Sequence, residues 1–386
     1  MSHSLSDKRF SLMRSTLHFI ALALSGMALL WCSAPVVYGQ TGPTLTSQQP
    51  PIRIAVEPAY QSVTHQGREL SQFSTRLMAS VPLLRNLQAY VRASVAQSDA
   101  NGLESVQGLD DVRLGASYAR ALSLGSLVMA ADLSIPTGKR NLSAVEWRTS
   151  ILASQNIYGF RVGGFGQGFN AEPRLTWAVP VRENVMLGIG AGYTYRGPYE
   201  PTEALQGAYD PGNEVEVFGG ADVRVGQHHA ISTDLSYTRF GSDTVEGEKR
   251  YEARYKLAGT VQYLFQRDFT TVRVVGQLQH WPESRIFVPN LGFGAEPIFE
   301  DNQVVPSEWL LRARGSSRVV EWMDLGVTLT GQRFEETVVQ EEAVVGAVEV
   351  APTFHLPGDV YLTPGVGYAI GDVERFEARI RTEVRL

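Results

Sequence analysis

The stretch GFRVGGFGQGFN, residues 159–170, sets five glycines and three phenylalanines around a single arginine. Glycine-rich loops of this kind can hold phosphate groups with their backbone amides. A dinucleotide-binding loop would need a further glycine at 169 or 171, where the chain has Phe169 and Ala171. The segment PTGKR, residues 136–140, also lacks the earlier glycine and the hydroxyl residue of a P-loop. We therefore predict no cofactor, and the glycines indicate close packing of bare backbone.

The histidines do not form a site for a metal or for catalysis. The pair His228 and His229 falls in a predicted tight turn, and no His-x-x-x-His or mixed Cys/His spacing occurs. A hydrolase would need a serine, a histidine and an acid that meet at one point. His280 is the only plausible general base, and its predicted strand register turns it toward lipid, so we expect neither a metal site nor an enzyme.

The elements that carry these residues are predicted to be strands, because polarity alternates with a period of two almost everywhere after Pro51. In residues 252–266, Tyr255, Leu257 and Val261 lie on one face, while Arg254 and Lys256 lie on the other. The final strand alternates apolar residues from 376 to 386 with charged residues from 377 to 385. Such strands suit either a soluble sandwich or a barrel in a membrane.

Three features favour the barrel. Tight connections, near 85, 123, 182, 226, 266, 321 and 357, alternate with long ones such as 98–110, 136–171, 196–213 and 284–308. Tyrosines collect where strands meet the long loops, at Tyr193, Tyr195, Tyr237, Tyr255 and Tyr368. No apolar run outside the N-terminus is long enough for a spanning helix, so a membrane-embedded sheet has to close on itself. The predicted fold is all-β, a transmembrane antiparallel up-and-down β-barrel.

The strand count follows from the predicted starts, which lie near 52, 71, 87, 112, 126, 173, 185, 214, 230, 252, 269, 309, 322, 344, 360 and 374. This gives sixteen strands, with twelve and fourteen as alternatives because Pro58 interrupts the first strand. Both chain ends then fall at the end with the tight turns, the periplasmic side of an outer-membrane barrel.

The N-terminus has the three parts of a cleaved signal peptide: basic residues, an apolar stretch from about 17 to 31, and small residues before a cleavage site. We expect a signal peptide over 1–39, a short linker over 40–51 and the barrel over 52–386, placed in the outer membrane of a Gram-negative envelope. The net charge of −6 argues against binding nucleic acid. Expected partners are outer-membrane lipid, small solutes and, through the C-terminal strand, the barrel-assembly machinery.

Residues 108–140 begin with Gly-Leu-Asp-Asp, continue with Arg113 and Gly115, and end in a return strand that finishes with Pro-Thr-Gly-Lys. This segment resembles the outer-membrane barrel family associated with meta-pathway phenol degradation. The resemblance covers one hairpin well and later hairpins loosely. It implies an outer-membrane channel or uptake protein for small molecules, including aromatic or apolar ones.

Charged residues of the strands are predicted to face the lumen, because at mid-membrane an Arg or Lys on the lipid face would cost about 2–4 kcal/mol. The candidate pore-lining residues are Arg254, Lys256, Arg273, Arg312, Arg314, Arg379 and Arg381 on the basic side, and Glu216, Asp222 and Asp234 on the acidic side. One hypothesis is a transverse field that favours polar or anionic solutes. The alternative is a set of cross-strand ion pairs that fill and stiffen the interior.

The longest connection, residues 136–171, is predicted to be the third outer loop, with a short helix in SAVEWRTSILASQNI. In general porins the third loop folds into the lumen and forms the constriction, and the same role is expected here by analogy of loop order. The candidate constriction residues are Phe160, Arg161, Phe165, Gln167 and Phe169. The phenylalanines either line a path for aromatic or apolar solutes, or cap the rim by packing on each other.

The sequence thus predicts a channel or uptake pore for the passive passage of small molecules. The alternative is a structural or adhesive outer-membrane barrel with a closed lumen, which binds partners through its outer loops.

Overall fold

A computed structural model describes residues 51–203, 205, 207–288, 298–338 and 340–386. The predicted signal peptide and almost all of the linker lie outside the described residues. Sixteen long strands form the wall of the barrel. They are β1 (Arg53–His65), β2 (Arg68–Leu84), β3 (Leu87–Ala100), β5 (Val112–Leu122), β6 (Gly125–Ile135), β7 (Asn170–Arg182), β8 (Val185–Arg196), β10 (Glu214–Val225), β11 (His229–Phe240), β14 (Tyr255–Arg267), β15 (Thr270–His280), β18 (Glu308–Val320), β19 (Met323–Phe334), β20 (Ala343–Leu356), β21 (Val360–Gly371) and β22 (Glu374–Arg385).

The sheet closes on itself. Each wall strand pairs antiparallel with the next wall strand along the chain, and β22 pairs with β1, for example Arg385 with Arg53. The sixteen-strand prediction is confirmed, including the first strand, in which Pro58 is opposite Thr75. The predicted starts differ from the observed ones by at most three residues, as at Arg68, Asn170 and Tyr255.

The outward face of the wall is apolar. Many of its large side chains are exposed, among them Leu77, Leu133, Ile189, Leu235, Leu311, Val348 and Ile380. Tyr193, Tyr195, Tyr237 and Tyr368 are exposed toward the loop end, and the rings of Tyr237 and Tyr255 stack with centroids 5.7 Å apart. An apolar band bounded by aromatic residues is the surface of a barrel that spans a membrane. No helix of the described residues is long and apolar enough to cross one.

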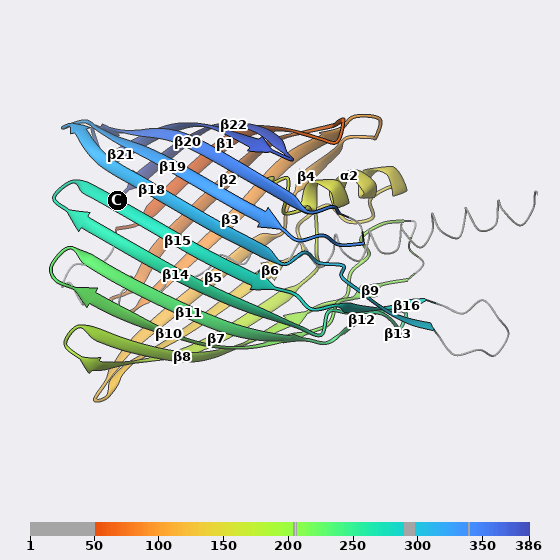
Figure 1. The fold of residues 1–386 in the computed structure, drawn as a ribbon, viewed down its shortest axis with the longest axis horizontal. Coiled ribbons are helices and arrows are strands. Elements are labelled where there is room, and N and C mark those ends of the chain that lie inside the picture. Colours follow the sequence, from red (N-terminus) through yellow and green to blue (C-terminus); the bar gives the residue numbers. More distant parts are fainter. Residues whose placement is uncertain (1–50, 204, 206, 289–297, 339) are drawn as a thin grey trace, which may run out of the picture.

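The two ends of the barrel differ (Figure 1). One, the turn end, has tight connections and the C-terminus, where Leu386 and Ile52 exchange backbone hydrogen bonds. The other, the loop end, carries helix α2 (Ala144–Ser154) and small strands. Five of these strands pair into a separate sheet: β9 (Tyr209–Asp210), β12 (Ser242–Val245), β13 (Glu248–Glu252), β16 (Ser284–Val288) and β17 (Ile298–Asn302).

Helix α2 begins where the sequence provides a cap. Ser143 accepts a hydrogen bond from the Glu146 amide while the Glu146 carboxylate accepts one from the Ser143 amide, a capping box. The Glu146 carboxylate also pairs with Lys139 Nζ at 2.5 Å, and this pairing lowers the pKa of Glu146. The predicted short helix is therefore present, at the start of the segment that enters the lumen.

Candidate functional site: the lumen and its inserted loop

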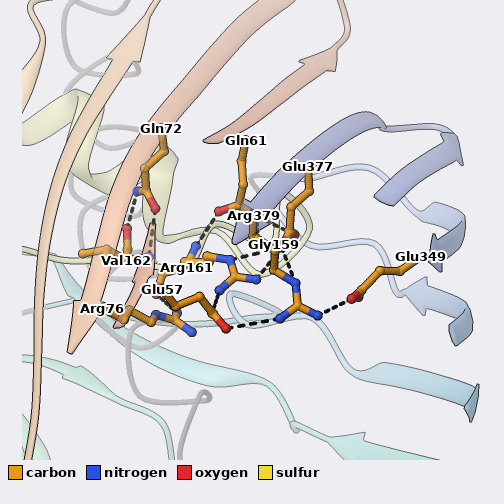
Figure 2. A network of polar contacts seen from close by, with 10 residues as sticks. All are labelled: Glu57, Gln61, Gln72, Arg76, Gly159, Arg161, Val162, Glu349, Glu377 and Arg379. Carbon is orange, nitrogen blue, oxygen red and sulfur yellow. Dashed lines mark hydrogen bonds and ion pairs between the residues drawn. The ribbon is translucent and has the colours of Figure 1, made fainter. Parts of the chain in front are cut away.

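Residues 155–168, which follow α2, return into the barrel, and residues 159–162 lie along the inward face of β1, β2 and β22 (Figure 2). Two glutamines hold the loop backbone. Gln61 donates to the Gly159 carbonyl at 3.1 Å and accepts from the Arg161 amide at 2.9 Å. Gln72 donates to the Val162 carbonyl at 2.7 Å and accepts from the Val162 amide at 3.0 Å. The two glutamines are opposite each other on β1 and β2. Their side-chain amides give the loop backbone the hydrogen bonds that a neighbouring strand would otherwise give.

Arg161 then joins the loop to two strands through its guanidinium group. It pairs with the carboxylate of Glu57 on β1 and donates from Nε to Glu377 Oε1 on β22 at 3.1 Å. Its own carbonyl accepts a hydrogen bond from Arg76 on β2. The Arg161 and Glu57 side chains are nearly buried, so removing either would weaken the neutralisation of a charge in the interior.

Arg379 of β22 extends this network along the wall. Its Nη1 lies 3.2 Å from Glu57 Oε2, it pairs with Glu349 of β20, and its Nε lies 3.8 Å from Glu377. Arg381, the next inward residue of β22, pairs with Glu383 at 2.6 Å. The two predicted pore-lining arginines of β22 thus face inward, but both form ion pairs with carboxylates.

Above the ion pairs the loop packs through apolar side chains. Ile157 and Tyr158 are 2% exposed and form one cluster with Val63, Phe334 and other inward residues of β2, β3, β20 and β21. The Tyr158 carbonyl accepts from Arg375 at 3.1 Å. The loop is therefore fixed to this wall by both burial and charge.

The Asp-Asp pair of the 108–140 motif sits at a bulge between β4 (Val106–Leu109) and β5. On β3, Arg92 pairs with Arg113 and Val95 pairs with Leu109. Two residues lie between the β3 partners but three lie between Leu109 and Arg113, so the second strand has one extra residue. The bulge aims Asp111 at both ends of the loop, since its carboxylate accepts from the Gly138 amide at 2.8 Å and the Gln167 amide at 2.6 Å. The Asp-Asp part of the motif and its Pro-Thr-Gly-Lys part thus meet where Asp111 holds the backbone of Gly138.

Both aspartates at this bulge lie at the loop-end rim, beyond the outer end of β5, where Asp111 is buried and Asp110 is partly buried. Burial raises the pKa of the Asp111 carboxyl, although the two amide donors oppose the rise. Burial also raises the pKa of Asp110 to about 6, against the nearby positive charges of Arg113 and Arg92.

The three phenylalanines of the loop do not point in one direction. Phe165 is 3% exposed and packs against Ala96, Val106 and Val162. Phe160 packs beside Tyr158, with ring centroids 6.5 Å apart. Phe169 is 43% exposed on the outward face, 6.4 Å from the Tyr195 ring, because period-two alternation turns it away from the inward Asn170. The side chains of the expected aromatic path are thus distributed over two packed clusters and the outer surface.

Across the lumen, β14, β15 and β18 present basic side chains in a different setting. Lys256 lies 5.5 Å from the Trp281 ring centroid, and Arg273 is opposite Arg314 in register. Arg312 and Arg314 face inward and are exposed. Within the described residues, no carboxylate lies within 4.0 Å of the charged groups of Arg312 and Arg314, so these charges are open to the lumen.

The third part of the lumen wall, β6 to β11, is acidic. Glu216, Asp222 and Asp234 all have inward positions on β10 and β11. Arg174 of β7 bridges Glu172 at 2.5 Å and Glu216 at 3.3 Å, whereas no ion pair within 4.0 Å in the described ranges involves Asp222 or Asp234. Acidic and basic inward faces therefore stand next to each other around the ring.

Arg254 is the one candidate pore-lining residue that lies off the wall. The hairpin β12–β13 extends to Glu252, so β14 begins only at Tyr255, and Arg254 takes a positive φ of 60° between them. Its guanidinium pairs with Asp301 of β17 at 2.7 Å in the small sheet. The predicted strand start at 252 placed it too far along the wall.

Five residues of the network were not singled out from the sequence: Glu57, Gln61, Gln72, Arg76 and Glu377. A signal was available, because Gln61 and Gln72 are polar positions on the same period-two face of two adjacent predicted strands. What the sequence did not indicate is which wall the loop would meet.

The described part of the chain holds no group of three or more His, Asp or Glu side chains that could bind a metal ion. His280 Nδ1 contacts the Ser307 hydroxyl at 3.3 Å, yet that hydroxyl also lies 3.2 Å from the Trp281 amide and 3.5 Å from its carbonyl. The Ser307 hydroxyl is thus occupied in holding the backbone, a structural role.

Comparison with known proteins gives no family. No family model and no curated protein matches the sequence, so the meta-pathway family suggested by residues 108–140 is not confirmed. Among solved structures, the chain is similar to CdiB from Acinetobacter baumannii, with 8% identity, 86% of this chain and 60% of that chain covered, and a TM-score of 0.49. It is also similar to an outer-membrane channel from Pseudomonas putida F1, with 10% identity, coverage of 88% and 96%, and a TM-score of 0.41. The outer-membrane protein OprD from Pseudomonas aeruginosa gives 10% identity, coverage of 87% and 93%, and a TM-score of 0.42.

Proposed function

We propose that this protein is an outer-membrane channel for the passive passage of small solutes, with a preference for anions. One observation carries the proposal. The inserted loop is fixed to the wall of β1, β2 and β22, while Arg312 and Arg314 across the lumen remain exposed with no carboxylate of the described residues within 4.0 Å. Solutes would pass between the loop and the open basic wall.

The physical basis is the size of the barrel and the field inside it. A closed barrel of sixteen strands is wide enough for an aqueous lumen unless something fills it. The loop narrows the lumen from one side, and its arginine is paired and nearly buried against that wall. Exposed guanidinium groups next to a low-dielectric wall raise the local concentration of anions.

The sequence-based expectation of aromatic or apolar solutes is not part of this proposal. The three phenylalanines that would line such a path point in different directions, and Phe169 is on the outward face. The charged groups of Arg312 and Arg314 favour small polar or anionic solutes instead.

Export and membrane insertion complete the proposal. Residues 1–39 would act as a cleaved signal peptide, and 40–51 would join it to the barrel. The outward residues of β22, from Phe376 to Val384, would be recognised by the barrel-assembly machinery. The turn end would then face the periplasm and the loop end the outside.

A liposome-swelling assay with the refolded protein tests the pore directly. Vesicles that contain the barrel should swell in isotonic arabinose faster than vesicles without protein, and more slowly in a larger sugar such as raffinose. If swelling in arabinose equals that of empty vesicles, the pore proposal fails.

A second function would then be favoured, because the loop end carries its own folded layer. Tyr209, Tyr251, Trp281 and Val304 form a buried core within and beneath the five-stranded sheet. A structural or adhesive barrel with a closed lumen would use this layer to bind a partner. Absence of both swelling and conductance in a correctly folded barrel would support it.

A further inference from the structure

A recess of about 300 Å³ opens on the inward face near the turn end, below the open basic wall. Thr271 of β15, Arg314 and Ser316 of β18, Asp324 of β19 and Thr353 of β20 line it. All of these positions face inward, and Thr271 is opposite Ser316 in register. The recess therefore collects one guanidinium and three hydroxyl groups from β15, β18 and β20, with Asp324 of β19 between them.

The acidic member of the recess is already neutralised. Asp324 Oδ1 accepts from Arg318 Nε at 3.2 Å, and Asp324 Oδ2 lies 2.8 Å from His355 Nε2. Arg318 also lies over the Phe269 ring, 4.3 Å from its centroid, which fixes its direction. Both oxygens of Asp324 thus have partners, and the carboxylate does not compete for Arg314.

The groups that are left are those that would bind an anion. Arg314 forms no ion pair within 4.0 Å in the described part of the chain, and the side-chain hydroxyls of Thr271 and Ser316 form no hydrogen bond there either. A guanidinium group binds a carboxylate through two parallel hydrogen bonds, and hydroxyl groups donate to its remaining lone pairs. The volume lies at the small end of the range for ligand sites.

We propose that this recess binds a small organic carboxylate, with Arg314 on the carboxylate group and Thr271, Ser316 and Thr353 around it. Arg314 is the one guanidinium among the described residues that line the recess, so it balances one negative charge, and a second negative charge would lie against Asp324. The inference rests on the proposed channel function, for which it names the solute class and a binding site at the turn end of the path.

Ligand-observed NMR titrations on the refolded barrel in detergent micelles test the site, with sodium benzoate, sodium acetate and inorganic phosphate as probes. Benzoate and acetate should bind saturably. Arg314→Gln should weaken both by about tenfold, the loss expected for a charge-assisted hydrogen-bonded pair. Arg314→Lys should show a partial loss, because it keeps the charge without the planar fork. The paired change Thr271→Val with Ser316→Ala should weaken binding by about threefold.

The matched control is Arg120→Gln, an exposed arginine on the outward face of β5, which should leave binding unchanged. Binding that survives Arg314→Gln, or that falls equally with Arg120→Gln, would overturn the site. Phosphate binding tighter than that of both carboxylates would overturn the solute class. Conductance without carboxylate binding would refute the recess alone, whereas binding without conductance would refute the channel and leave the recess standing.

Discussion

The wall of β1, β2 and β22 and the wall of β14, β15 and β18 both carry several inward basic residues, but they use them differently. On the first, Arg379 pairs with Glu57 and Glu349, and Arg161 of the inserted loop pairs with Glu57 and Glu377. On the second, Arg312 and Arg314 are exposed to the lumen, and they form no such pairs with the residues that the structure describes. The first wall is closed, and the second is open.

The difference teaches that the number of charges on a strand does not decide what a wall does. In the network of Figure 2, the wall carries three glutamates, Glu57, Glu349 and Glu377, but only two arginines, Arg76 and Arg379, and Arg161 of the loop balances the excess negative charge. Such a match fixes a loop in place, because separating buried charges is costly. Where no loop brings counter-charges, the same residue type stays available to solutes.

The largest effect should come from removing the cover of the closed wall. Deleting residues 159–168 takes away Arg161 and the backbone held by Gln61 and Gln72, so single-channel conductance should rise several-fold. Planar-bilayer recordings measure this, with heat-modifiable gel mobility as the check on folding. An unchanged conductance in a folded barrel would mean that the loop caps the rim without narrowing the lumen.

Reversing the charges of the open wall should change selectivity without opening the channel. In the variant Arg312→Glu with Arg314→Glu, the preference for anions should turn into a preference for cations, because four units of charge change beside the path. Reversal potentials in a KCl gradient report this. The control Arg120→Gln lies on the outward face and should keep the wild-type ratio. An unchanged ratio in the reversed variant would place the path elsewhere.

The closed wall should also matter more for stability than an exposed pair. Arg161→Leu takes one of two shared arginine partners from Glu57 and Glu377, leaves only Arg379, and should lower the unfolding free energy by about 3 kcal/mol. Arg381→Leu removes a half-exposed pair with Glu383 and should cost about 1 kcal/mol or less. Urea unfolding in lipid vesicles measures both. Equal losses would mean that the buried network of the loop stabilises the barrel no more than a half-exposed ion pair does.

The smallest effect concerns pH at the loop-end rim. Burial raises the pKa of Asp110 to about 6, so lowering the pH from 7 to 5 protonates it and removes a negative charge beside Arg92 and Arg113. Anion preference should rise slightly over this range. The Asp110→Asn variant should show the higher preference already at pH 7 and lose this step. The step should remain in Arg120→Gln, and a step of the same size in Asp110→Asn would assign it to another group.

The strands were predictable because period-two alternation and tight turns are local properties. Even the strand with Pro58 is present, since the proline is opposite Thr75 without breaking the register. The lumen network was not predictable in the same way. It depends on the bulge at Asp110 and Asp111 and on where the closing pair of β1 and β22 stands relative to the loop, and these are properties of the whole ring.

The phenylalanines and Arg254 illustrate the same limit. A glycine-rich loop leaves the direction of each neighbouring side chain undetermined, so Phe160, Phe165 and Phe169 went to three different surroundings. Arg254 was displaced by the β12–β13 hairpin, which extends the chain beyond the wall before β14 begins.

The most direct test of the central claim is the reversal potential of the intact protein in a planar bilayer under a KCl gradient. Because the loop is fixed to one wall and the arginines of the other wall are exposed, we predict a steady conductance in which chloride is more permeable than potassium. No conductance from a correctly folded barrel, or a preference for potassium, would contradict this account.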